Sequence, residues 1–254
     1  MTGRDRAAAM PEWFDQDAFA VRFEWGPHGL RRLAPKVDVV VIVDVLRFTT
    51  CVDVAVGRGA QVLPYRWHDG DEAAFAEAQG AVLATSDDTG DGWSLSAAAL
   101  ASIPAGTRLV LPSANGSALS FGAAEAGAGL VVAACLRNAS AVAAHLVADG
   151  GTVGVVAAGE RWRGGTGPLR PAVEDLLGAG AVLAGLPLEH LSPEARAARA
   201  AFLAERDRLD DAIAACGSGR ELAETGRGRD LPLAAALDAS TVVPVLRQDR
   251  FVAG

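Results

Sequence analysis

A carboxylate and a guanidinium directly follow the most apolar stretch of this 254-residue chain. All five residues of Val39–Val43 are β-branched and apolar, which is typical of a strand buried on both faces of a parallel sheet. Asp44 ends this run and Arg47 follows, at the place where an open α/β sheet binds its ligands. The pair is suited to chemistry on an anion. Asp44 could instead cap the next helix and Arg47 could pair with it, and the sequence leaves both interpretations open.

Polar residues follow three further predicted strands in the same way. They are Ser113, Asn115, Gly116 and Ser117 after the first strand, Arg137 and Asn138 after the second, and Glu160 after the third. The first two groups also begin or precede a predicted helix, whose N-terminal N–H groups favour an anion, whereas Glu160 lies in a predicted glycine-rich loop. Because the carboxyl ends of parallel strands share one edge of a sheet, we expect these groups to converge with Asp44 on a single anion-binding site.

Glu174 and Asp175 are adjacent near the start of another predicted helix. Acidic residues in that position can simply offset the helix dipole. Together with Asp44 they can also supply oxygen ligands for Mg²⁺, which retains several waters and takes only a few carboxylates. The segment 226–230, which ends in Asp230, is expected to be a solvated loop rather than a site.

Several enzyme classes lack their signatures in this sequence. There is no G-x-x-x-x-G-K-[ST] and no convincing G-x-G-x-x-G after a strand, which disfavours an unrelated nucleotide-binding α/β enzyme. None of the three cysteines has an arginine six residues later, as a cysteine phosphatase loop requires. The four histidines show no metal-ligand spacing, and the residues after Asp44 lack the second carboxylate of a D-x-D aspartyl-phosphate motif.

The elements that must position these groups alternate along the chain. Strands are predicted at 21–25, 39–43, 61–64, 81–85, 107–111, 130–134, 152–157 and 241–246. Helices are predicted at 48–57, 71–79, 95–102, from 115, and at 139–148, 171–184, from 192 to either 205 or 216, 219–224 and 231–238, with turns or loops at 26–29, 86–92 and 159–167. This alternation predicts a single α/β domain over residues 1–254, a layered α/β/α sandwich around a mainly parallel or mixed sheet, with residues 1–12 flexible.

Composition narrows the class of protein. Half of the residues are apolar, so the chain can form a sizeable core, and the net charge of −8 argues against nucleic acid as a partner. The scattered cysteines suggest a reduced compartment. With no signal peptide and no membrane-spanning run, we expect a soluble, cytoplasmic protein that does not bind membranes. An alanine-rich domain of this kind could form a homodimer.

Six segments, in order, resemble motifs of the 2-phosphosulfolactate phosphatases. They are D-V-L-R-F-T-T (44–50), P-S-A-N-G-S (112–117), L-R-N-A-S-A-V-A (136–143), V-V-A-A-G-E (155–160), V-E-D-L-L-G-A-G (173–180) and G-R-G-R-D (226–230). The resemblance implies a Mg²⁺-dependent phosphomonoesterase of coenzyme M biosynthesis. Its substrate would be 2-phosphosulfolactate, a small anionic phospho-acid, and its products 3-sulfolactate and phosphate.

Roles for the candidate residues follow from this activity, because phosphoryl transfer depends mainly on positioning and charge stabilisation. Asp44, Glu174 and Asp175 are expected to hold Mg²⁺. Arg47 is expected to bind phosphoryl oxygens in a bidentate fork, and Glu160 to orient or deprotonate water. The other anionic groups are assigned to the segment from Ser113 to Ser117 with Arg137 and Asn138. A covalent route through Asp44 stays open.

One segment departs from the family pattern. The family's G-N-S-P segment is replaced here by D-G-W-S-L-S-A-A-A-L (91–100), and the stretch before it reads A-T-S-D-D-T-G (84–90). The alternative hypothesis is therefore a substrate-shifted homologue, or a catalytically lapsed one that binds a small anionic metabolite without turnover.

Overall fold

A nine-stranded sheet forms the centre of the computed structural model, which describes residues 12–66, 70–85, 92–162 and 167–254. Flexibility is predicted for residues 1–12, of which residues 1–11 lie outside these ranges, while Glu12 begins the short 3-10 helix η1 (Glu12–Asp15). The strands are β1 (Val21–Trp25), β2 (Val39–Val43), β3 (Gln61–Arg66), β4 (Val82–Leu83), β5 (Arg108–Ser113), β6 (Leu130–Ala134), β7 (Val153–Ala157), β10 (Pro244–Arg247) and β11 (Arg250–Ala253). A separate small hairpin consists of β8 (Glu160–Arg161) and β9 (Leu169–Arg170).

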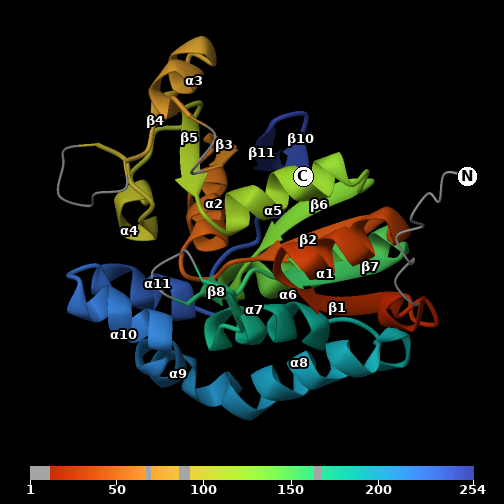
Figure 1. Ribbon diagram of the computed structural model, residues 1–254. Coiled ribbons are helices and arrows are strands. Elements are labelled where there is room, and N and C mark those ends of the chain that lie inside the picture. Colours follow the sequence, from red (N-terminus) through yellow and green to blue (C-terminus); the bar gives the residue numbers. More distant parts are fainter. Residues whose placement is uncertain (1–11, 67–69, 86–91, 163–166) are drawn as a thin grey trace, which may run out of the picture.

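Helices cover the sheet, as the alternation of elements predicts. They are α1 (Gly26–Leu33), α2 (Phe48–Gly57), α3 (Glu72–Ala78), α4 (Ala97–Leu100), α5 (Gly116–Glu125), α6 (Ala139–Asp149), α7 (Val173–Ala184), α8 (Pro193–Glu205), α9 (Leu209–Ala215), α10 (Gly217–Glu224) and α11 (Leu231–Ala235), with the 3-10 helix η6 (Gly228–Asp230) before α11. Figure 1 shows α8 and α9 along the lower side of the molecule and α3 at the top. The predicted layered α/β fold with a mixed sheet is confirmed.

Two groups of parallel strands run in opposite directions within this sheet. The strand order is β1-β7-β2-β6-β10-β11-β3-β5-β4. The first four strands are parallel to one another, and so are the last three. The antiparallel hairpin of β10 and β11 lies between the groups and pairs antiparallel with each of them. The carboxyl ends of β2 and β5 therefore do not belong to one parallel array, contrary to the condition on which the predicted convergence rested.

The segments that follow these two ends nevertheless meet, because the Gly116 N–H at the start of α5 donates to Asp44. Five steps separate β2 from β5 in the strand order. At roughly 20–25° of twist per step, the accumulated rotation is about 100–125°, so the reversed strand crosses β2 steeply. In Figure 1 the β5 arrowhead points down toward the middle of the molecule, where the first residues of α5 follow it.

The strand β2 is buried on both faces, as its uninterrupted apolar run predicts. Val39, Val41 and Val43 face a core that includes residues of α6, α7, α8 and α9. Val40 and Ile42 face the opposite core, which includes residues of α1 and α5. This double coverage fixes the strand that carries Asp44 at its end.

Three predictions about local structure are wrong. The presumed turn at 26–29 is the start of α1, which has proline in its first turn and buries Gly26, Gly29, Leu30 and Leu33. The presumed final strand is a hairpin inserted into the middle of the sheet. The loop predicted at 159–167 contains β8, although its residues 163–166, like residues 86–91, lie outside the described ranges.

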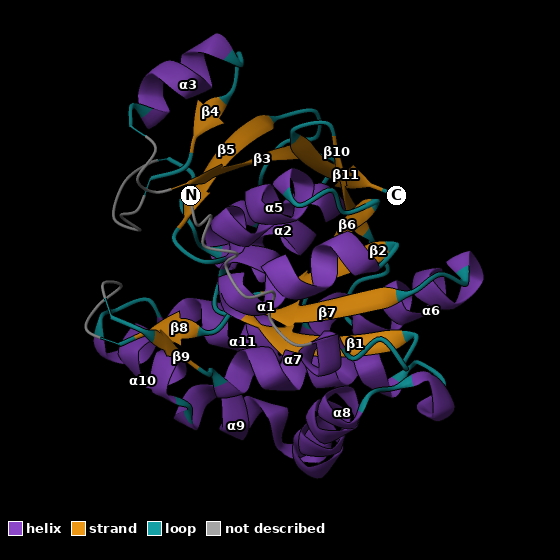
Figure 2. Cartoon of the chain, turned by 45° about the vertical axis from the view of Figure 1, so that its right-hand side comes forward, coloured by secondary structure: helices purple, strands orange, loops and turns teal. Residues whose placement is uncertain are grey.

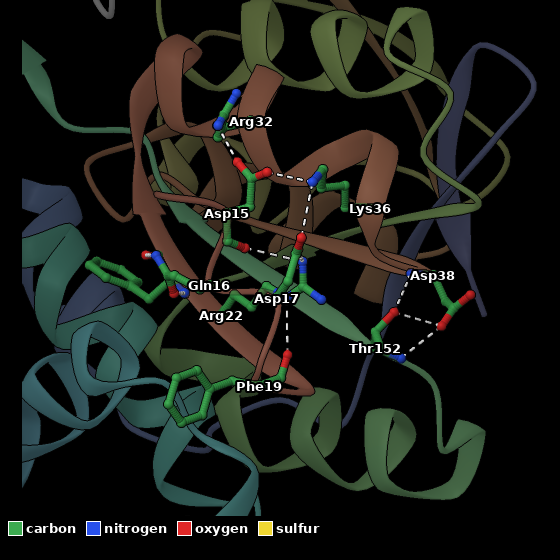
Figure 3. Close-up of polar contacts among 10 residues, drawn as sticks. Asp15, Gln16, Asp17, Phe19, Arg22, Arg32, Lys36, Asp38 and Thr152 are labelled. Atoms are coloured by element: carbon green, nitrogen blue, oxygen red, sulfur yellow. Dashed lines mark hydrogen bonds and ion pairs between the residues drawn. The ribbon is translucent and has the colours of Figure 1, made fainter. Parts of the chain in front are cut away.

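An ion-pair network holds the N-terminal segment against α1 (Figure 3). The carboxylate of Asp15, which is only 1% exposed, contacts both Arg32 and Lys36. Lys36 also pairs with Asp17 at 3.0 Å, and the Arg22 guanidinium pairs with Asp17 at 2.7 Å. This network, defined by Asp15, Asp17, Arg22, Arg32 and Lys36, is called the N-terminal network below. Within the ranges that the structure describes, no helix has the length and apolar character needed to cross a membrane.

Candidate active site

Asp44 lies at the carboxyl end of β2 and is almost fully buried, with 5% of its surface exposed. The backbone N–H of Gly116 donates to its Oδ2 at 2.8 Å, and the N–H of Phe48 donates to its Oδ1 at 3.3 Å. The second of these bonds satisfies the N–H of the first residue of α2, although the N-cap residue of that helix is Arg47. The first bond joins Asp44 to the start of α5, 72 residues away in the sequence.

Glycine is required at position 116 by this contact. A Cβ atom there would lie 2.3 Å from Cδ1 of Phe48 and 2.7 Å from Oδ2 of Asp44. Both separations are shorter than real Cβ contacts allow. The glycine of the N-G-S segment therefore lets the helix N-terminus reach the carboxylate directly, which a larger residue would prevent.

Asp175 holds the loops after β2 and β7 together. Its Oδ1 accepts the Val45 N–H at 2.7 Å and its Oδ2 accepts the Gly159 N–H at 2.8 Å. The helix α7 approaches closely enough for these bonds because Gly178 has no side chain, and a Cβ atom there would lie 2.5 Å from Cγ2 of Val45. Asp175 thus has a clear structural role beside Asp44.

Glu174 is buried without full hydrogen bonding. Its side chain is 3% exposed, and in the described part of the chain its Oε2 has no hydrogen-bond partner. A buried carboxylate oxygen without a partner carries a desolvation penalty of about 1–3 kcal/mol or more. Burial and the neighbouring Glu174 carboxylate raise the pKa of the Cys216 thiol to about 12, so Cys216 lies beside this acid although the sequence did not point to it.

Glu160 connects the end of β7 to the start of α5. Its Oε1 accepts the Asn115 side-chain N–H at 3.1 Å and the Arg161 backbone N–H at 2.9 Å. Figure 2 shows the β8–β9 hairpin, which Glu160 begins, beyond the arrowhead of β7. Asp44, Glu160, Glu174 and Asp175 are called the acidic cluster below.

Burial and mutual repulsion disfavour the charged forms of this cluster. Burial, followed by Glu160 and Glu174, raises the pKa of Asp44 to about 7. Burial, followed by Asp44 and Glu174, raises the pKa of Asp175 well above its usual value. Carboxyl groups that raise one another's pKa in this way are common at functional sites.

Arg47 pairs with an acid that the sequence analysis assigned to a solvated loop. Its Nη1 lies 3.3 Å from Oδ2 of Asp230, and both side chains are buried. Asp230 is 1% exposed, so the expectation of a solvated loop is wrong at this residue. The only signal in the sequence was the G-R-G-R-D motif itself.

Ser113 and Ser117 support the turn that precedes α5. The Ser113 hydroxyl accepts the Asn115 N–H at 3.3 Å, and the Ser117 hydroxyl donates to the Leu111 carbonyl at 2.9 Å. Asn115 immediately precedes the helix, and its side chain reaches Glu160 rather than the helix backbone. The predicted segment therefore does lie beside Asp44 and Glu160.

The contacts of Arg137 and Asn138 favour a structural role over the predicted substrate-binding role. Arg137 donates to Asp53 at 2.8 Å and to the Leu233 carbonyl at 3.3 Å. The buried Asn138 side chain donates to two backbone carbonyls and accepts the Cys135 N–H at 2.9 Å. These hydrogen bonds tie β6, α2 and the C-terminal segments together, and none involves the acidic cluster.

The acidic cluster fits a cation that takes few protein ligands. Across the described ranges, no three His, Cys, Asp or Glu side chains are arranged as a ready metal cage. Mg²⁺ needs only one or two carboxylates, because it keeps most of its waters. The unsatisfied Glu174 oxygen and the repulsion felt by Asp44 are the features that such an ion would relieve.

Comparison with known proteins identifies the family. A family model described as 2-phosphosulpholactate phosphatase matches residues 29–249. A Thermus thermophilus protein named "Probable 2-phosphosulfolactate phosphatase" is 32% identical over 221 residues, which cover 83% of this chain and 88% of that protein. The matched region contains the whole acidic cluster, Gly116 and Arg47. The chain therefore belongs to the 2-phosphosulpholactate phosphatase family, whose members are phosphoric monoester hydrolases.

Proposed function

We propose that this chain hydrolyses 2-phosphosulfolactate, or a similar small phospho-acid, to the corresponding hydroxy acid and phosphate, and that it depends on Mg²⁺. The observation that carries the proposal is the 2.8 Å bond from the Gly116 N–H to Asp44, which joins a buried acidic cluster to a helix N-terminus. A phosphate ester needs both features, a site that takes up anions and carboxylates that can hold a cation or move a proton.

The start of α5 is the proposed anion-binding element. Its first turn contains Gly116 and Ser117. The Gly116 N–H already donates to Asp44, so the N–H groups proposed for the substrate are the others of this turn, which point along the helix dipole. Ser113 and Asn115 fix the turn before the helix, so the binding groups are held in place before substrate arrives. Arg47 is proposed to donate to the phosphoryl oxygens in addition.

Asp44 and Glu174 are the residues proposed to hold Mg²⁺. The support is the unsatisfied oxygen of Glu174 and the raised pKa of Asp44, because a divalent cation would compensate both. When bound, the ion would supply a Lewis acid that polarises the phosphoryl group. Asp175 is a further proposed ligand, because each oxygen of Asp44 and Asp175 that accepts one backbone N–H keeps a second lone pair for the ion.

Glu160 is proposed as the general base. It is half-buried and held by Asn115 and Arg161, so its orientation is set at the edge of the cluster. Glu160 takes a proton from water as the water oxygen bonds to phosphorus. The bond from phosphorus to the ester oxygen breaks, and that oxygen leaves with the electron pair and receives the proton from Glu160. We favour water over Asp44 as the nucleophile because both Asp44 oxygens accept backbone N–H groups.

Phosphate release from a panel of small phospho-acids tests this proposal. Wild-type protein should release phosphate in Mg²⁺ and lose activity in EDTA. Asp44→Asn should lower kcat/KM by roughly 1000-fold or more, because it removes a group proposed to act at the reaction centre. The matched control is Asp53→Asn, which alters a buried acid that pairs with Arg137 instead. Activity that is unchanged in EDTA would contradict the role of Mg²⁺, and an active Asp44→Asn variant would contradict the site.

A substrate-shifted or lapsed homologue is the second candidate. It is favoured by segment 91–100, which departs from the family pattern and whose Ser96 contacts the acid that pairs with Arg47. In that case sulfolactate or phosphate should raise the unfolding temperature, while no phospho-acid in the panel is turned over. Turnover of 2-phosphosulfolactate itself would exclude this candidate.

A further inference from the structure

The buried carboxylate of Asp230 bonds to Arg47 and to a second segment, and both partners are distant from it in the sequence. It ends η6 and directly precedes α11, and only 1% of its surface is exposed. Its Oδ2 lies 3.3 Å from Nη1 of Arg47, 183 residues away in the sequence. The arginine itself is only 8% exposed, so the pair is screened from solvent.

The second carboxylate oxygen of Asp230 is anchored separately. Its Oδ1 accepts the Ser96 hydroxyl at 2.7 Å and the Ala98 backbone N–H at 2.9 Å. Ser96 is also the N-cap of α4, where its hydroxyl accepts the Ala99 N–H. Because a carboxylate is planar, two bonds at Oδ1 set the direction in which Oδ2 meets Arg47.

An arginine that is oriented in this way is suited to catalysis on an anion. A guanidinium has five N–H donors, so a carboxylate on one side does not consume its capacity to donate. A long side chain that is already ordered loses less entropy when substrate binds. Among the hydrogen bonds of the described residues, the Asp230 carboxylate contacts Arg47, Ser96 and Ala98, and Arg47 is the one of these that is proposed to bind the substrate.

We propose that Asp230 is a positioning residue that fixes the Arg47 guanidinium for the phosphoryl group, and that Ser96 sets the direction of Asp230. This inference rests on the proposed function, in which Arg47 binds phosphoryl oxygens. The inference also links segment 91–100 to the proposed site. Within that segment, Ser96 and Ala98 hold the carboxylate of Asp230 that pairs with Arg47.

A double-mutant cycle tests the inference. In Asp230→Asn the amide oxygen should stay with the two donors, Ser96 and Ala98, which turns the amide NH₂ toward Arg47 and removes the ion pair. We expect kcat/KM to fall by about tenfold in Asp230→Asn and by about 1000-fold in Arg47→Ala. The double variant should lose no more than Arg47→Ala alone. If the fold losses in kcat/KM of the two single variants multiply in the double variant, the inference is overturned, because Asp230 would then act independently of Arg47.

Binding of inorganic phosphate, measured by titration calorimetry on the same four proteins, separates the inference from the proposed function. A weaker phosphate affinity in Asp230→Asn that disappears in the Arg47→Ala background supports the inference even if no phospho-acid is turned over. Turnover by wild-type protein with multiplying losses leaves the function standing and overturns the inference. If neither Arg47→Ala nor Asp230→Asn changes phosphate affinity or turnover, the inference fails.

Two further variants guard against a simple folding defect. Ser96→Ala keeps the Asp230 charge but removes one anchor, so kcat/KM should fall about two- to threefold and only when Arg47 is present. Asp53→Asn breaks a comparable buried pair, Asp53 with Arg137 at 2.8 Å, and should lower stability without any dependence on Arg47. If Ser96→Ala retains full activity while Asp230→Asn fails to fold, Asp230 is a structural residue and the inference is wrong.

Discussion

Buried acidic side chains have different kinds of partners in two regions of this molecule. In the N-terminal network, Asp15 contacts the cationic side chains of Arg32 and Lys36 (Figure 3). In the acidic cluster, Asp44 and Asp175 accept only backbone N–H groups, and Glu174 keeps an oxygen without a partner within the described residues. The first region uses charge to hold the chain together. In the second, burial and neighbouring carboxyl groups raise the pKa of Asp44 and Asp175, which is common at functional sites.

The difference has a cost in stability. Burying carboxylates beside one another opposes folding, whereas a buried carboxylate with cationic partners is compensated. Proteins retain such destabilising arrangements where function requires them. We therefore expect the stability and activity of the protein to depend differently on the two regions. The tests are a change of pH, a glycine substitution that crowds the acidic cluster, and removal of an acidic side chain.

The largest expected effect is a pH dependence of opposite sign in the two regions. The folded-state pKa of Asp44 is raised to about 7 from its usual 3.8, so its carboxyl group favours folding at pH 4 and this contribution is lost as pH rises to 7. The shift corresponds to at most about 4 kcal/mol of unfolding free energy. Asp17 has a lowered pKa, chiefly because Lys36 donates to it, so its contribution is lost as pH falls.

Chemical denaturation in EDTA between pH 4 and 7 measures this effect. The unfolding free energy of wild-type protein should fall relative to that of Asp44→Asn as pH rises. Asp17→Asn is the control: its curve should run parallel to the wild-type curve between pH 4 and 7 and approach it only below pH 4, where Asp17 becomes protonated. Parallel curves for wild type and Asp44→Asn would show that folding does not raise the pKa of Asp44, and would contradict the prediction.

A substitution that adds a methyl group beside the acidic cluster should have the next largest effect on stability and activity. Gly116→Ala places a methyl group against Phe48 and Asp44, so we expect a loss of about 3 kcal/mol of stability together with weaker activity. Gly57→Ala is the matched control, because its new Cβ would lie 3.5 Å from Val242 in ordinary contact. Thermal unfolding and phosphate release measure both variants. Equal stability of the two would show that the approach of α5 to Asp44 is not tight.

Loss of the acid in the N-terminal network should have the smallest effect on function. Asp15→Asn should lower the unfolding free energy by about 2 kcal/mol, less than for a fully buried pair because Arg32 and Lys36 are partly exposed. Its kcat/KM should match wild type, in contrast to Asp44→Asn. A loss of activity as large as that of Asp44→Asn, at a temperature where both are folded, would remove the distinction between the two regions.

The sequence alone determined the local features on which this site depends. The apolar run of β2 predicted a strand buried on both faces, and that strand does end at Asp44. The polar residues after β5 and β7 were predicted to approach Asp44, and Gly116 and Glu160 lie there. These signals are readable because burial pattern and turn chemistry are encoded within a few neighbouring residues.

Only the tertiary structure decided how these local features combine. The helix α1 forms where glycine and proline predicted a turn, because its apolar face is buried against the sheet. The β10–β11 hairpin enters the middle of the sheet and reverses the direction of β3, β5 and β4. Asp230 becomes a buried partner of Arg47, and Arg137 pairs with Asp53. Each outcome depends on contacts between segments far apart in the chain, and a local pattern of residues does not specify which distant segment will supply the partner.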